Sequence, residues 1–184
     1  CRRTCDEGVT ILRYAVIYQS KSGNTQRVAE QIFKSLSSEQ KLLCNLDTMT
    51  KIPESDVYFI GFGIHNGSCS LDMINCMEQI TGGRLVLFVT CGGAATQQYK
   101  ERLETRLEIW LPERAEYLGM FLCQGNVDSA QRDLMLRNMP EKEEALTQLF
   151  EMGSAHPDKA DLENAAWFTQ QIEKAAEKRT VPIH

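Results

Sequence analysis

Five short apolar runs alternate with longer stretches of helical pattern along this 184-residue chain, and that alternation limits the folds open to it. The runs lie at residues 11–18, 42–46, 57–63, 85–90 and 117–123. Two of them, VYFIGFG and LVLFVT, are almost continuously hydrophobic, which is typical of parallel strands buried on both faces. Strands separated by helical crossovers form a parallel sheet covered by helices. We therefore predict an α/β fold with a doubly wound, five-stranded parallel sheet.

Between the runs, apolar residues recur at the spacing of a helix that buries one side. Helices are expected at residues 25–36, 70–80 and 96–111, and from the N-cap residue Asp158 onward. The stretch 128–153 is expected to add two helical pieces, with Pro140 at the start of the second and Gly153 at its end. We expect Trp110 and Trp167 to pack inside the protein.

Length and composition suit one ordinary globular domain, with 42% apolar and 24% charged residues. We place this domain at residues 12–178, with the helical pieces at 128–153 as an insertion. Residues 1–11 are expected to form a loose tail, disordered or foreign to the natural protein, and residues 179–184 a second tail. No apolar run approaches the roughly 20 residues of a membrane span, and no signal peptide opens the chain. We therefore expect a cytoplasmic protein without membrane attachment.

Cysteine usage and charge exclude several classes of function. The seven cysteines are odd in number and mostly lie in apolar stretches, which favours free thiols in a reducing compartment. With no CxxC pair and only three histidines, we expect no metal site. The net charge of −5 argues against nucleic acid as a partner, whereas it permits docking to a basic patch on a protein.

The loop after the first run, QSKSGNT at residues 19–25, has the composition of a phosphate-binding loop. It runs directly into a predicted helix, whose free N–H groups favour an anion at that end. Hydrogen bonds to a phosphate can be donated by the side chains of Ser20, Ser22, Asn24 and Thr25. The Walker sequence GxxxxGK[ST] and the Rossmann sequence GxGxxG are both absent here. A plain polar turn with a capping threonine remains the alternative.

Taken with its strand, the segment YQSKSGNT resembles the phosphate-binding signature of flavodoxins. GFGIHNGS at residues 61–68 and TCGG at residues 90–93 are similar to the second and third flavin loops of that family. Segments 117–125 and 156–166 resemble the tail of a bacterial flavodoxin branch, so that the resemblance extends over about residues 12–176.

The resemblance implies a sheet order of 2-1-3-4-5 and the cofactor FMN. The FMN phosphate would lie on the first loop, and the flavin ring would lie between the second and third loops. The cofactor-binding residues implied in this way are Ser20, Lys21, Ser22, Gly23, Asn24, Thr25, Gly63, Ile64, His65, Asn66, Gly67, Thr90, Cys91, Gly92 and Gly93.

Two features of the ring loops are of mechanistic interest. In flavodoxins a carbonyl at the position of Asn66 rotates toward N5–H of the flavin as an electron arrives, and both Asn66 and Gly67 tolerate the positive φ that this needs. Cys91 would be a small neutral contact beside the ring. Many flavodoxins stack Trp or Tyr on the ring, but here His65 is the only flat side chain among residues 63–67, and Tyr99 is expected in the core.

The leading interpretation is an electron carrier in which FMN takes electrons from a reductase and passes them to a partner enzyme. No protein residue is assigned a catalytic role, because the cofactor supplies the chemistry. The first alternative is an FMN-dependent NAD(P)H quinone-type oxidoreductase. The second is a flavin-poor accessory protein that docks to a larger redox enzyme.

Overall fold

The centre of the protein is a five-stranded parallel sheet, seen here in a computed structural model that describes residues 11–65 and 67–178. The strands are β1 (Tyr14–Tyr18), β2 (Lys41–Asn45), β3 (Val57–Gly63), β4 (Arg84–Cys91) and β5 (Glu116–Gln124). They lie in the order β2-β1-β3-β4-β5, and each neighbouring pair is parallel. This confirms the predicted fold class and sheet order. Of the expected tails, residues 1–10 and 179–184 lie outside the described residues.

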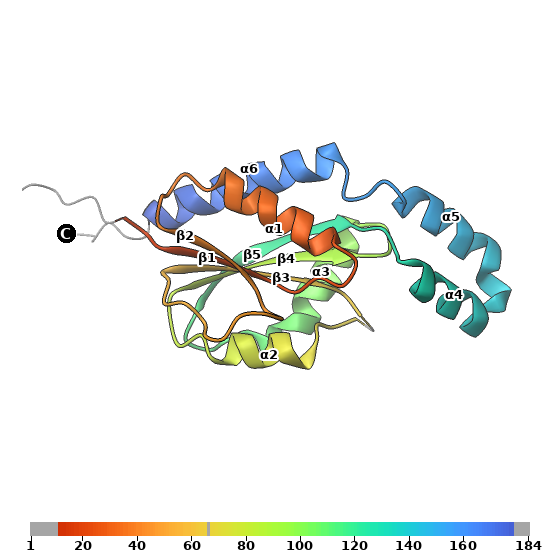
Figure 1. Ribbon diagram of the computed structural model, residues 1–184, viewed down its shortest axis with the longest axis horizontal. Coiled ribbons are helices and arrows are strands. Elements are labelled where there is room, and N and C mark those ends of the chain that lie inside the picture. Colours follow the sequence, from red (N-terminus) through yellow and green to blue (C-terminus); the bar gives the residue numbers. More distant parts are fainter. Residues whose placement is uncertain (1–10, 66, 179–184) are drawn as a thin grey trace, which may run out of the picture.

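Helices cover both faces of the sheet (Figure 1). They are α1 (Asn24–Ser35), α2 (Leu71–Glu78), α3 (Gln97–Leu107), the 3-10 turn η1 (Glu108–Trp110), α4 (Ser129–Asn138), the 3-10 turn η2 (Pro140–Lys142), α5 (Glu143–Gly153) and α6 (Lys159–Lys178). Helices α1 and α6 lie on one face, and α2 and α3 lie on the other (Figure 1). Helices α4 and α5 project beyond the end of β5 at the carboxyl edge of the sheet (Figure 1).

The core is two apolar layers, one on each face of the sheet, because successive strand side chains point to opposite faces. In β1, Val16 packs in the layer under α1 and α6, and Ile17 packs in the layer under α2 and α3. A close approach in the centre of the sheet requires a glycine. A Cβ atom on Gly61 would lie 1.9 Å from Cε2 of Phe88, so no larger residue fits there without movement.

Some element ends differ from the prediction. The first apolar run begins its strand at Tyr14, three residues later than expected, and Ile11 is 59% exposed. The helix expected to reach residue 111 ends at Leu107 and continues as η1. In β5 the register with β4 shifts by one residue at Leu118, and a bulge of this kind leaves no mark in the hydrophobic pattern.

The expectation that Trp167 packs inside is wrong. Its side chain is 63% exposed on α6, whereas Trp110 is half-buried against the core layer under α2 and α3. The buried face of α6 is formed by Ala165, Thr169, Ile172, Glu173 and Ala176. Trp167 lies two positions from Ala165, which is about 200° around the helix, so it points away from that face.

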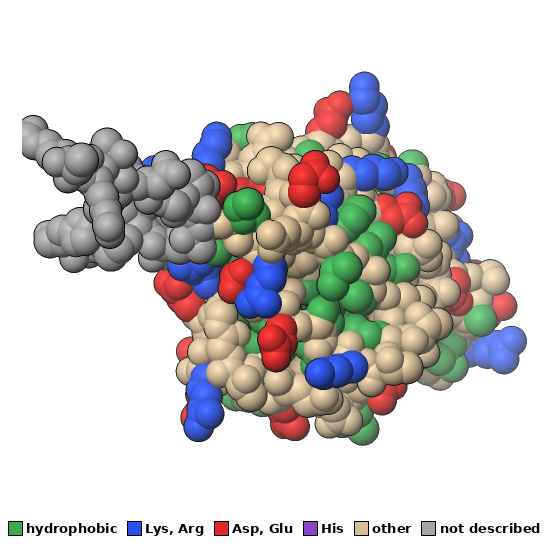
Figure 2. Space-filling view, turned by 60° about the vertical axis from the view of Figure 1, so that its left-hand side comes forward, with side chains coloured by type: hydrophobic (Ala, Val, Ile, Leu, Met, Phe, Trp, Pro, Cys, Tyr) green, Lys and Arg blue, Asp and Glu red, His purple; other side chains and the backbone are tan. Residues whose placement is uncertain are grey.

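The surface combines charges of both signs with apolar side chains. Figure 2 shows hydrophobic side chains gathered near the centre of one face, with Lys, Arg, Asp and Glu around them. Large exposed apolar side chains include Leu71 and Ile109, at 76% and 74% exposure. Within residues 11–65 and 67–178, no helix combines the length and the apolar character that a bilayer crossing demands.

Candidate functional site

The three loops singled out from the sequence meet at the carboxyl edge of the sheet. They follow β1, β3 and β4, which are neighbours in the sheet. Oγ1 of Thr25 lies 2.9 Å from Oγ1 of Thr90, which joins the first loop to the third. The N–H of Ile64 donates to the carbonyl of Thr90 at 2.9 Å, which joins the second loop to the third. A Cβ atom on Gly63 would lie within 4 Å of the threonine hydroxyls and of Nε2 of His65.

The first loop enters α1 through a glycine rather than a side-chain cap. Gly23 holds the N-cap position at φ +85°, and no side chain accepts a hydrogen bond from the first turn of α1. Helices α2, α3 and α4 instead begin with capping side chains, from Ser70, Thr96 and Asp128 respectively. The first N–H groups of α1 are therefore open toward the loop, together with the positive end of the helix dipole.

The hydrogen-bond donors of this loop divide into engaged and free groups. Nδ2 of Asn24 donates to Oγ of Ser22 at 2.9 Å and to the carbonyl of Asn126 at 2.7 Å, which uses both of its hydrogens. Oγ of Ser20 is buried and has no hydrogen-bond partner among the described residues. Lys21 is exposed beside it. A buried hydroxyl without a partner is costly, so Ser20 indicates a ligand at this loop.

The second loop is a tight turn held by its own backbone. His65 and Ser68 exchange backbone hydrogen bonds at 3.0 and 3.1 Å, and the His65 side chain is exposed. Gly67 has φ +78°, and a Cβ atom there would lie 2.0 Å from Nη1 of Arg106. The guanidinium of α3 therefore lies directly against this loop. The expected movement of the Asn66 carbonyl concerns a residue outside the described ranges.

In the third loop, Cys91 is a buried neutral thiol. Its Sγ lies 3.2 Å from the carbonyl oxygen of Gly93 and 3.6 Å from that of Cys123. Burial raises the pKa of Cys91 to about 11, while the hydrogen bond to Gly93 works in the opposite direction. Gly92 packs against Val127, whose Cγ2 is 2.6 Å from the place of a Cβ on Gly92. A Cβ atom placed on Gly93 would have no other atom within 4 Å, so that part of the loop is open.

Sequence reasoning missed one contributor to the site, the segment 125–127 after β5. The N–H of Gly125 donates to the carbonyl of Cys91 at 2.8 Å, and the carbonyl of Asn126 accepts from Asn24. A Cβ atom on Gly125 would lie 2.7 Å from Nδ2 of Asn24. The segment therefore connects the first loop to the third. A glycine two residues after an apolar run was the available signal, and such glycines also occur in ordinary turns.

Comparison with known proteins identifies the family. The flavodoxin domain matches residues 15–170, which is most of the chain. This chain belongs to the flavodoxin family. The flavodoxin-like domain-containing protein BilS of Clostridioides difficile (strain CD3) is 27% identical over 169 residues, covering 88% of this chain and 96% of BilS.

Solved structures show the same flavodoxin fold at low sequence identity. Oxidised flavodoxin 1 from Bacillus cereus is 18% identical with a TM-score of 0.52, and the match covers 92% of this chain and 99% of that one. Rubredoxin oxygen:oxidoreductase from Desulfovibrio gigas is 14% identical with a TM-score of 0.55, covering 92% of this chain but 37% of that one.

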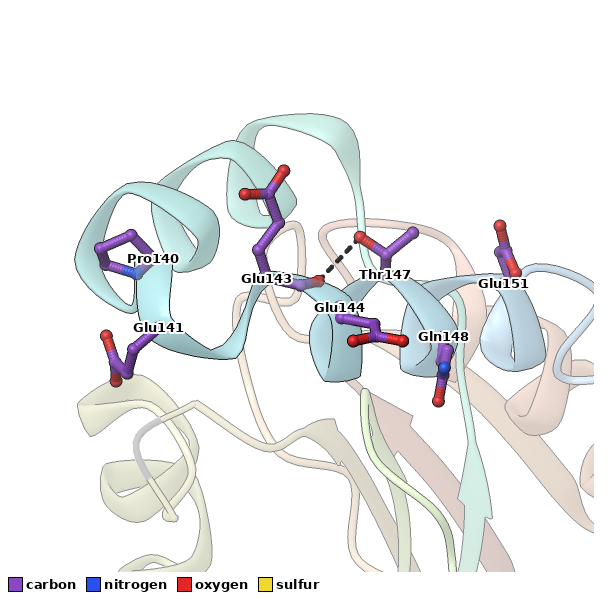
Figure 3. A pocket seen from close by; sticks show the side chains of 7 residues that line it. All are labelled: Pro140, Glu141, Glu143, Glu144, Thr147, Gln148 and Glu151. Atoms are coloured by element: carbon purple, nitrogen blue, oxygen red, sulfur yellow. Dashed lines mark hydrogen bonds between the residues drawn. The ribbon is translucent and has the colours of Figure 1, made fainter.

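A surface hollow of about 630 Å³ in this flavodoxin-family protein is formed by residues outside the three loops (Figure 3). Its lining comes entirely from the segment that forms η2 and α5, namely Pro140, Glu141, Glu143, Glu144, Thr147, Gln148 and Glu151. Four carboxylates would repel a phosphate, so the flavin phosphate is not expected there.

A cluster of His156, Asp158 and Asp161 brings three potential metal-ligand atoms within 4.8 Å of one another. Asp158 and Asp161 already serve as the N-terminal cap of α6, and Nδ1 of His156 lies 2.5 Å from Oδ2 of Asp161. Oδ1 of Asp158 accepts from the N–H of Asp161 at 3.0 Å, and Oδ2 of Asp161 accepts from the N–H of Asp158 at 2.9 Å. The hydrogen bond from the Asp161 N–H lowers the pKa of Asp158. The predicted cap at Asp158 is therefore confirmed, and it accounts for the cluster structurally.

Proposed function

We propose that this chain binds FMN and acts as an electron carrier between a reductase and a partner enzyme. The observation that carries the proposal is the buried hydroxyl of Ser20, which has no partner among the described residues and lies in the loop that enters α1. A phosphate at that place would accept from Ser20 and from the open N–H groups of α1. This arrangement fits a phosphomonoester such as that of FMN.

The remaining residues take roles that follow from their placement. Ser22 keeps its own O–H hydrogen for the phosphate while its oxygen accepts from Asn24, and Lys21 adds a positive charge at the rim. Gly23 has the positive φ with which the loop enters α1, a backbone conformation that glycine adopts easily. For the ring, the walls proposed are residues 63–67 and 90–93, which the hydrogen bond between Ile64 and Thr90 holds together.

FMN, when bound, supplies the redox chemistry by taking up two electrons and releasing them one at a time. The protein's own residues set its surroundings. Cys91 stays neutral at ordinary pH because of its raised pKa, so it adds no negative charge beside the ring. The net charge of −5 favours docking to a basic face of the redox partners. Free thiols at Cys44, Cys69, Cys76, Cys91 and Cys123 suit the reducing cytoplasm.

The first test is the visible spectrum of the purified protein before and after incubation with FMN and desalting. We expect a flavin spectrum that survives desalting. A protein that stays colourless would contradict FMN binding and support the flavin-poor accessory role. The carrier role is tested next by mixing the loaded protein with a flavodoxin reductase. Reduction by the reductase, with reoxidation by an added one-electron acceptor, is expected.

A second function is favoured by the openness of the ring loops. No Trp or Tyr side chain stands at residues 63–67 or 90–93, and Tyr99 packs against the core layer under α2 and α3. An uncovered ring face would admit a small substrate such as a quinone. Steady NAD(P)H oxidation by the purified protein alone, in the presence of a quinone, would establish the quinone-type oxidoreductase instead of the carrier.

A further inference from the structure

The segment 125–127 is a junction between the flavin loops and the helical insertion. On one side, the carbonyl of Asn126 accepts from Nδ2 of Asn24, which also donates to the hydroxyl of Ser22 in the phosphate loop. On another side, the N–H of Asn126 donates to the carbonyl of His156 at 2.9 Å. The segment itself has no regular secondary structure, so its shape depends on such contacts.

The side chain of Arg132, in the insertion, donates two hydrogen bonds to this segment. Nε of Arg132, in α4, donates to the carbonyl of Val127 at 2.6 Å, and its Nη2 donates to Oδ1 of Asn126. The Arg132 guanidinium also lies over the ring of Phe150 in α5, 5.4 Å from the ring centroid. Arg132 is therefore held by both helices of the insertion while it holds the two residues that follow Gly125.

We propose that Arg132 is a positioning residue for the flavin phosphate, acting from the insertion through Asn126 and Asn24. The proposal rests on the proposed FMN binding and deepens it. The path has three links: Arg132 fixes Asn126, the Asn126 carbonyl fixes the amide of Asn24, and that amide fixes the hydroxyl of Ser22. The insertion thus sets the shape of the phosphate loop before FMN arrives.

The guanidinium is suited to this task by its shape more than by its charge. Its donors form a planar fork that can satisfy two acceptors at fixed angles, and a lysine ammonium cannot reproduce that geometry. Without the fork, the junction loses two of its contacts, and Asn24 loses a fixed acceptor. Binding of FMN then has to order the loop at the cost of affinity.

The test is a double-mutant cycle measured by FMN affinity, using the quenching of flavin fluorescence. We expect Arg132→Gln and Asn24→Ala each to raise the FMN dissociation constant about tenfold, the scale of one lost hydrogen bond to a charged or polar network. If Arg132 acts through Asn24, the double variant is no weaker than the weaker single variant. Arg137→Gln, an exposed arginine of the same helix, is the matched control and should leave affinity unchanged.

Arg132→Lys separates the fork from simple charge attraction. We expect it to bind FMN as weakly as Arg132→Gln, and wild-type affinity in the lysine variant would overturn the proposal. Additive losses in the cycle, about a hundredfold in the double variant, would also overturn it. Should Arg132→Gln fail to fold by circular dichroism, Asn126→Ala replaces it in the cycle, because it removes the side-chain acceptor of Arg132. A wild-type protein that binds no FMN would refute the proposed function rather than this inference.

Discussion

At the scale of single residues, the hydroxyl of Ser20 links stability to binding. It is buried without a partner among the described residues, and such a group costs about 1–3 kcal/mol of folding free energy. In Ser20→Ala we therefore expect the flavin-free protein to unfold at equal or higher urea concentration. We also expect the FMN dissociation constant to rise by roughly tenfold or more, because a hydrogen bond to phosphate is lost.

Riboflavin is the internal control for Ser20→Ala, since it carries the ring without the phosphate. Its affinity should change little in the variant. Ser35→Ala is the matched control variant, because the hydroxyl of Ser35 donates to the carbonyl of Gln31 at the end of α1 opposite the loop. Equal losses for FMN and riboflavin would show that Ser20 does not face the phosphate.

The raised pKa of Cys91 leads to a prediction about how its reactivity depends on pH. Its pKa of about 11 means that burial favours the neutral thiol, so the reactive thiolate becomes abundant only as the pH approaches that value. At pH 8 its thiolate fraction is about a hundredfold below that of a thiol with a pKa near 9, and its reaction with iodoacetamide should be slower by at least that factor. Mass spectrometry of the alkylated Cys91 peptide measures this. In urea the same peptide should react at the ordinary rate, and rapid alkylation of the folded protein at pH 8 would contradict the prediction.

At the scale of elements, the packing of β3 against β4 depends on a glycine. Because Cε2 of Phe88 lies 1.9 Å from the place of a Cβ on Gly61, Gly61→Ala has to displace a buried ring. We expect a loss of about 1–3 kcal/mol in the free energy of unfolding, measured by urea denaturation. Gly82→Ala is the control, since a Cβ there meets nothing within 4 Å. A loss in Gly82→Ala equal to that in Gly61→Ala would show that the effect is not steric.

At the scale of the whole molecule, the three loops lie on separate crossovers of one sheet, so a ligand that joins them stabilises the complete fold. A ligand at one hundred times its dissociation constant adds about 2.7 kcal/mol to the free energy of unfolding. For a protein of this size, that corresponds to a rise in Tm of roughly 5–10 °C with FMN. Differential scanning fluorimetry measures the shift, and the shift should be smaller in Ser20→Ala at the same FMN concentration. An unchanged Tm at saturating FMN would contradict the proposed site.

The amino-acid sequence by itself determined the parallel sheet and the candidate loops, whereas the order of the strands was implied by the resemblance to flavodoxins. Strand and helix periodicity are local properties, and QSKSGNT is a contiguous motif whose composition and place after a strand indicate phosphate binding. Parallel strands then force the loops after β1, β3 and β4 to one edge. The hydrogen bond between Thr25 and Thr90 agrees with that expectation.

Only the tertiary structure decided what the side chains do at that edge. Asn24 has the composition of a phosphate donor, yet its amide is taken by Ser22 and by Asn126, which lies 102 residues further along the chain. The sequence likewise did not predict that Trp167 points outward or that Arg132 donates to residues 126 and 127. Contacts of this kind depend on how distant segments pack, which local hydrophobic pattern does not encode.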